Sequence, residues 1–191
     1  MATRASLSKS FSLWFITTLL ITIIFATIYI VVQQTIRIGA NGPQIQMAED
    51  GAAGLLSGKS VQNVVPAETI DMEHSLAPYV IVFDNNRQAV ASSAKLDNQI
   101  PTPPSGVFDY ARVHGQDRLT WQPKNGVRSA IVMVHYDHGF VLAGRSLREI
   151  EKRENQLTST VFAAWIASLL VIFVASFSHM LSHKKSLREK S

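Results

Sequence analysis

Two long apolar runs, one near each end of the chain, constrain the fold more than any other feature. Residues 11–32 read FSLWFITTLLITIIFATIYIVV without one charged side chain, and residues 161–178 read VFAAWIASLLVIFVASFS. About 20 helical residues are enough to cross a hydrocarbon core of about 30 Å. The second run can be extended back to Leu157 without adding a charge. We therefore predict transmembrane helices at 11–32 and 157–178.

A cleaved signal peptide is the alternative interpretation of the first run. The apolar core of a signal peptide spans about 7 to 15 residues and is followed by a small-residue cleavage site. Residues 11–32 form a longer run, and no A-x-A sequence follows it. Trp14 and Tyr29 lie near its two ends, which is typical of aromatic side chains at a membrane interface. The sequence therefore favours a membrane anchor.

The formal charge of +4 is concentrated in the two terminal tails. Residues 1–10 carry +2 and residues 179–191 carry +3, whereas residues 33–156 carry −1. By the positive-inside rule, both tails should lie in the cytoplasm next to anionic lipid, with residues 33–156 periplasmic or extracellular. Nucleic-acid binding is not expected, because the central segment offers no net positive field to phosphates. The bilayer that we expect as a partner is the inner membrane.

Between the spans, the sequence predicts an α+β domain with an N-terminal helix. Pro43 is suited to the first turn of that helix and Gly58 to its end. A short helix over 106–114, with Ser105 as its N-cap, interrupts a series of strands. Alternating or continuous apolar runs bounded by turn sequences predict five strands: 79–84, 87–93, 118–122, 128–136 and 139–145. We expect an antiparallel sheet with helices on one face.

A last helix is predicted to begin near Ser146 and to enter the second span without a break. No glycine or proline follows in SLREIEKRENQLTST, and the spacing of Ser146 and Glu149 suits a capping box. Apolar side chains recur along one face of this helix at Leu147, Ile150, Leu157 and Val161. That face could pack on the first helix or on a second protomer.

Two segments of the central domain resemble a known family of sensor domains. YVIVFDNNRQAVASSAKLD (79–97) and GFVLAGRSLREIEKRE (139–154) are similar to single Cache or PDC domains, the PAS-like extracytoplasmic sensors of bacterial kinases and chemoreceptors. PQIQMAEDGAAGLL and WQPKNGVR also resemble a group of small bacterial two-span proteins. The resemblance implies a pocket for a carboxylate or amino acid near 106–113 and the strands around Trp121 and Ile131. Residues 179–191 leave no room for the output module of such sensors, so a homodimer or a membrane partner would supply it.

Six central residues are candidates for contact with a small anionic ligand. Aromatic walls combined with guanidinium groups suit a small anion. The candidates are Tyr110, Arg112, Arg118, Trp121, Arg128 and Tyr136. Core or rim positions for the aromatic residues, and solvated positions for the arginines, are the alternative.

No catalytic residue, cofactor or metal site is predicted. The chain has no cysteine, no G-x-S-x-G sequence and no glycine-rich phosphate loop. His135 and His138 flank Asp137 but lack further ligands at a fixed spacing. We therefore expect no enzyme but a membrane-anchored, sensor-like domain that binds a small ligand or a partner. A structural or accessory subunit of a membrane complex, without a pocket, is the alternative.

Overall fold

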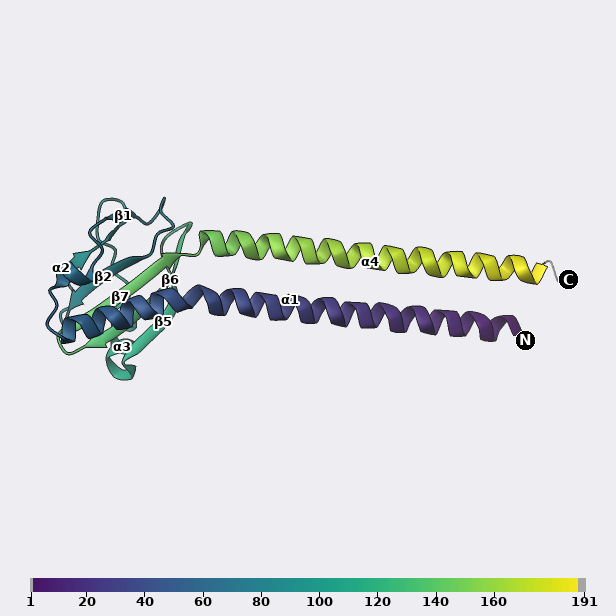
Figure 1. Cartoon of the computed structure of the whole chain (residues 1–191), viewed down its shortest axis with the longest axis horizontal. Coiled ribbons are helices and arrows are strands. Elements are labelled where there is room, and N and C mark those ends of the chain that lie inside the picture. Colours follow the sequence, from purple (N-terminus) through teal and green to yellow (C-terminus); the bar gives the residue numbers. More distant parts are fainter. Residues whose placement is uncertain (1, 189–191) are drawn as a thin grey trace. The chain divides into compact units, whose positions relative to one another are not determined.

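The computed structural model describes residues 2–188, which form two compact units. One unit holds the residues up to Thr35 and those from Arg153 onward, and the other holds residues 36–152. Helices α1 (Ala2–Leu56) and α4 (Arg148–Arg188) each contribute to both units (Figure 1). The chain therefore consists of a helical unit, made from both of its ends, and a central α+β unit.

The helical unit is apolar on its outside. Two segments, Trp14–Ile36 and Arg148–Ser178, are long and apolar enough to cross a membrane. The apolar windows in these segments are not buried within the chain, and large side chains such as Phe15, Leu20 and Phe173 are about half exposed or more. By length and composition, both helices fit the two predicted spans.

Within this unit α1 and α4 pack side by side, as Figure 1 shows. The half-buried side chains recur every three or four residues, as in a left-handed coiled coil: Thr18, Thr22, Phe25, Tyr29 and Val32 on α1, and Leu157, Val161, Trp165, Ser168 and Ile172 on α4. Three hydrogen bonds join the helices at successive levels: Gln33 Nε2 to Glu154 Oε1 (2.7 Å), Thr158 Oγ1 to Tyr29 OH (3.4 Å) and Trp165 Nε1 to Thr22 Oγ1 (3.2 Å). These bonds place α1 beside this part of α4, which is one of the two partners considered for the Leu157 and Val161 face; packing on a second protomer stays a prediction.

The central unit contains a five-stranded sheet in which all neighbouring strands are antiparallel. The order is β3-β2-β7-β6-β5. The strands are β2 (Tyr79–Asp84), β3 (Ala89–Ser92), β5 (Gln116–Lys124), β6 (Val127–Tyr136) and β7 (Gly139–Ser146). All five predicted strands are therefore confirmed, and so is the α+β class with an antiparallel sheet.

Helices cover both faces of this sheet, so the expectation of helices on one face is wrong. The C-terminal part of α1 packs Ala48 and Ala52 on one face, and α3 (Ser105–His114) packs Phe108 on the other. The blue end of α1 crosses the strands in Figure 1. The physical reason lies in the strands, because Tyr79 to Phe83 of β2 are buried on both sides and each side needs a cover.

Pro43 does not begin a helix but lies inside α1. A proline in a helix removes one backbone hydrogen bond and crowds the preceding turn. The turns after it are held against the sheet, since Gln44 and Ala48 are fully buried there. Tertiary packing therefore outweighs the local cost of the proline. As predicted, the helix stops just before Gly58, which has a φ of +87°.

Two further expectations about the helices and strands need correction. Ser105 does not cap α3: it is the first helical residue, Pro104 occupies the N-cap position, and no side chain caps the helix. A two-residue parallel pair between β1 (Ile70–Asp71) and β4 (Ala94–Lys95), and the short helix α2 (Val61–Val64), were not predicted. Both pieces are too short to produce a periodic signal in the sequence.

Candidate functional site

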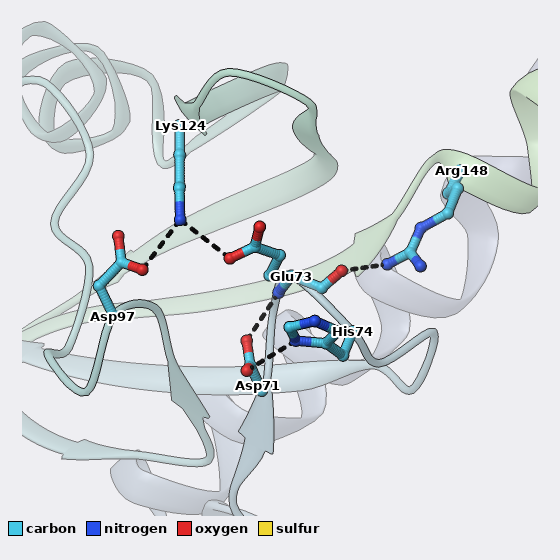
Figure 2. Close-up of polar contacts among 6 residues, drawn as sticks. All are labelled: Asp71, Glu73, His74, Asp97, Lys124 and Arg148. Carbon is cyan, nitrogen blue, oxygen red and sulfur yellow. Dashed lines mark hydrogen bonds and ion pairs between the residues drawn. The ribbon is translucent and has the colours of Figure 1, made fainter.

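Six polar residues meet where helix α4 leaves the sheet, and we call them the ionic cluster (Figure 2). Its members are Asp71, Glu73, His74, Asp97, Lys124 and Arg148. They come from four places: the end of β1 with the loop after it, the turn after β4, the end of β5, and the first residue of α4. The cluster therefore joins segments that are far apart in the sequence.

Lys124 lies at the centre of the cluster. Its ammonium Nζ is 2.9 Å from Glu73 Oε2 and 2.9 Å from Asp97 Oδ1. These two hydrogen bonds, first that to Glu73 and then that to Asp97, raise the pKa of Lys124 above its ordinary value. The ammonium therefore stays charged at neutral pH, and both carboxylates share one counterion.

The loop after β1 is ordered by its own hydrogen bonds. Asp71 Oδ1 accepts a bond from the Glu73 amide (2.8 Å), and Asp71 Oδ2 lies 2.9 Å from His74 Nδ1. These contacts, with the side-chain bond to His74 as the largest cause, lower the pKa of Asp71. The Ser75 amide donates to the Asp71 carbonyl at 2.8 Å. Glu73 thus lies within a compact turn.

Arg148 connects this loop to helix α4. Its guanidinium donates to the backbone carbonyl of Glu73 at 2.5 Å, while the Arg148 amide donates to the Ser146 hydroxyl at 3.4 Å. Glu73 thus uses its side chain for Lys124 and its carbonyl for Arg148. This arrangement connects the loop after β1 to the first residue of helix α4.

The six residues predicted to contact a ligand are divided between the two faces of the sheet. Trp121 belongs to the core cluster beneath α3, whereas Tyr136 belongs to the cluster beneath α1. Arg112 donates to the Asn85 carbonyl (3.1 Å) and lies 5.3 Å from the centre of the Phe140 ring. Tyr110 is 51% exposed on the outside of α3.

The two other arginines also have partners in the fold. Arg118 donates to Gln116 Oε1 and approaches Glu49 of α1 at 3.9 Å. Arg128 pairs with Glu151 of α4. The six residues are therefore not gathered around one cavity, and their contact with a ligand stays a prediction.

Aromatic rings fill the space where the resemblance implies a pocket. Phe108 of α3 lies edge to face against Phe83 at 5.1 Å and against Phe140 at 5.2 Å, measured between ring centres. Phe83, Phe108 and Phe140 are each at most 1% exposed. A ligand between α3 and the sheet would have to displace these rings.

The helical unit has an apolar groove of about 420 Å³ between its two helices. It is lined by Thr22, Phe25, Ala26, Tyr29, Thr158, Val161, Phe162 and Trp165. Acyl chains of a bilayer would fill such a groove without any specific recognition. It therefore does not identify a ligand.

Histidines and carboxylates do not converge on a metal site within the described residues 2–188. His135 lies against the Phe140 ring at 5.0 Å, and His138 meets Tyr136 at 6.3 Å, measured between ring centres. Both predicted candidates therefore pack on aromatic side chains at the end of the β6–β7 hairpin.

Sequence reasoning missed Glu73, Asp97 and Lys124 as partners. Lys124 stands in the sequence Lys-Asn-Gly, which by itself indicates only a turn. Its two acidic partners are 51 and 27 residues away, so no local spacing could reveal them. Comparison with models of known protein families, with curated proteins and with solved structures finds no match to this chain.

Proposed function

We propose that this protein is a two-span inner-membrane protein that carries a PAS-like or Cache-like sensor domain on the far side of the membrane. Both termini would lie in the cytoplasm, as the basic tails predict. The supporting observation is that α4 runs from the end of β7 through its apolar segment without a break. A displacement of its first turn can therefore reach the membrane span along one helix.

A small anionic ligand, or a partner protein, is the proposed input. A ligand changes the balance between two helix arrangements only by binding one of them more tightly. The first turn of α4 contacts the sheet domain through Arg148 and Glu151, so it is the place where such a change would arrive. A second copy of the chain, or a membrane partner that carries an output module, would receive this change.

Ligand binding can be tested by thermal unfolding of the purified full chain in detergent against a panel of small carboxylates and amino acids. A ligand that binds only the folded state raises the melting temperature. At a ligand concentration 100 times its Kd, it adds about 2.7 kcal/mol to the free energy of unfolding. Arg112→Ala should reduce this shift if Arg112 contacts the ligand. Arg145→Ala, a change at another exposed arginine, is the matched control. A shift lost equally in both variants would contradict a role for Arg112.

An accessory subunit without a pocket is the second candidate, and one observation favours it. The space between α3 and the sheet is filled by Phe83, Phe108 and Phe140. If the whole panel leaves the melting temperature unchanged and a membrane protein co-purifies in stoichiometric amount, the accessory role replaces the sensor role.

A further inference from the structure

We infer that Lys124 is a positioning residue that couples the loop after β1 to the first turn of helix α4. The loop spans residues 71–75 and carries Glu73, which contacts Lys124 and Arg148 at once. The coupling itself is a property of the central unit. Its consequence for the membrane helices rests on the proposed sensor function.

The first half of the coupling runs through Glu73. Its carboxylate is held by the Lys124 ammonium at 2.9 Å, and its carbonyl accepts from the Arg148 guanidinium, as Figure 2 shows. One residue of the loop therefore connects the end of β5 to the start of α4. A movement of Glu73 alters both contacts together.

The second half of the coupling runs through the β5–β6 hairpin. Four residues after Lys124, the Arg128 guanidinium pairs with Glu151 of α4. The Arg128 carbonyl accepts a hydrogen bond from the Leu147 amide at 2.9 Å, just before α4 begins. The hairpin that carries Lys124 thus contacts the first turn of α4 through residues other than Glu73.

Together these contacts form a closed ring. It runs from Glu73 to Lys124, along the hairpin to Arg128, across to Glu151, back along α4 to Arg148, and from there to Glu73. Because each member is held from two sides, loss of one contact loosens the others. Lys124 is the only side chain in this ring that also binds a third segment, through Asp97, within the contacts described for residues 2–188.

Charge explains why Lys124 is the sensitive position. Three carboxylates, of Asp71, Glu73 and Asp97, belong to the ionic cluster, and Lys124 binds two of them. Replacing Lys124 with glutamate removes their shared cation and adds a fourth acid. The new carboxylate repels those of Glu73 and Asp97, so the loop that carries Glu73 should move away from the β5–β6 hairpin.

Hydrogen exchange of the full chain in detergent, read by mass spectrometry, tests this inference. In Lys124→Glu we expect about two- to fivefold faster exchange, the range for surface ion pairs, in residues 71–77 and also in the first turn of α4. The Ser75 and Glu151 amides, both bonded at 2.8 Å, are the reporters. Lys59→Glu, an equal charge change at an exposed position between α1 and α2, is the control and should leave both peptides unchanged.

Two further variants complete the design. The charge swap Glu73→Lys with Lys124→Glu should restore part of the slow exchange, because the pair of residues 73 and 124 is re-formed in reverse while Asp97 loses its cation. Arg148→Ala should accelerate exchange in residues 71–77, since coupling between two sites is reciprocal. Arg148→Ala also tests the coupling if Lys124→Glu fails to fold.

Faster exchange in residues 71–77 of Lys124→Glu with the first turn of α4 unchanged, together with unchanged exchange of residues 71–77 in Arg148→Ala, would overturn the coupling. Unchanged exchange in both peptides would do the same. The measurement needs neither a ligand nor a bilayer. Unchanged exchange would therefore contradict only the coupling. A ligand panel without any effect would contradict only the sensor function.

Discussion

Replacing Gly139 with alanine is expected to cost the central domain about 3 kcal/mol or more of unfolding free energy, from backbone strain and overpacking combined. Gly139 has a φ of +154°, which side chains rarely adopt. A carbon added to it would lie 2.0 Å from the carbonyl oxygen of Phe83 on the neighbouring strand. Gly139 is the first residue of the central strand β7 and pairs with Asp84 and Tyr136, so the clash falls where this strand leaves the β6–β7 turn.

Urea unfolding of the full chain in detergent measures this cost. In a Trp14→Phe, Trp165→Phe background Trp121 is the one tryptophan left; it is buried in the core, so the fluorescence reports on the central domain. Gly126→Ala is the matched control, with a φ of +81° but nothing within 4 Å of the added carbon. Its cost should stay near the roughly 1 to 2 kcal/mol of a left-handed residue. Equal costs at both glycines would refute the clash with Phe83.

Truncating Phe108 to alanine is expected to destabilise the same domain by about 3 to 5 kcal/mol. The Phe108 ring is 1% exposed and contacts Phe83 and Phe140 edge to face. Its removal leaves a cavity between α3 and the sheet and takes away both aromatic contacts. The loss can be read from the same fluorescence-detected unfolding curves.

Tyr110→Ala provides the control on the same helix. Tyr110 is 51% exposed and stacks on His114 at 4.0 Å between ring centres. Its truncation should change the unfolding free energy by no more than about 0.5 kcal/mol. A comparable loss in both variants would mean that α3 does not depend on its Phe108 face. A loss of ligand response without a loss of stability in Tyr110→Ala would instead support the predicted contact.

Most of the sheet could be predicted because its signals are local. Most of the long strands are continuous apolar runs next to a turn sequence, as in the run from Gly139 that follows Asp137 and His138, and β5 alternates Leu119 and Trp121 with polar residues. The run YVIVFD also contained the information that both faces of the sheet are covered, since its apolar side chains point to both sides. The expectation of helices on one face conflicts with this pattern.

The remaining features depend on contacts between distant residues. Nothing in the sequence near Pro43 shows that Gln44 and Ala48 are buried against a sheet, so the continuity of α1 could not be predicted. The parallel pair of β1 and β4 is held at Ile70 and Asp71 by partners 24 residues away. The ionic cluster is hidden for the same reason, because its members lie on four separate segments.

In the proposed topology, both apolar helices cross the membrane and the sheet domain lies on the far side. Alkaline phosphatase, which is active only outside the cytoplasm, can be inserted in the loop 101–104 or fused after residue 191. We expect high activity for the loop insertion and none for the C-terminal fusion. An active fusion at the C-terminus together with an inactive insertion in the loop would contradict it.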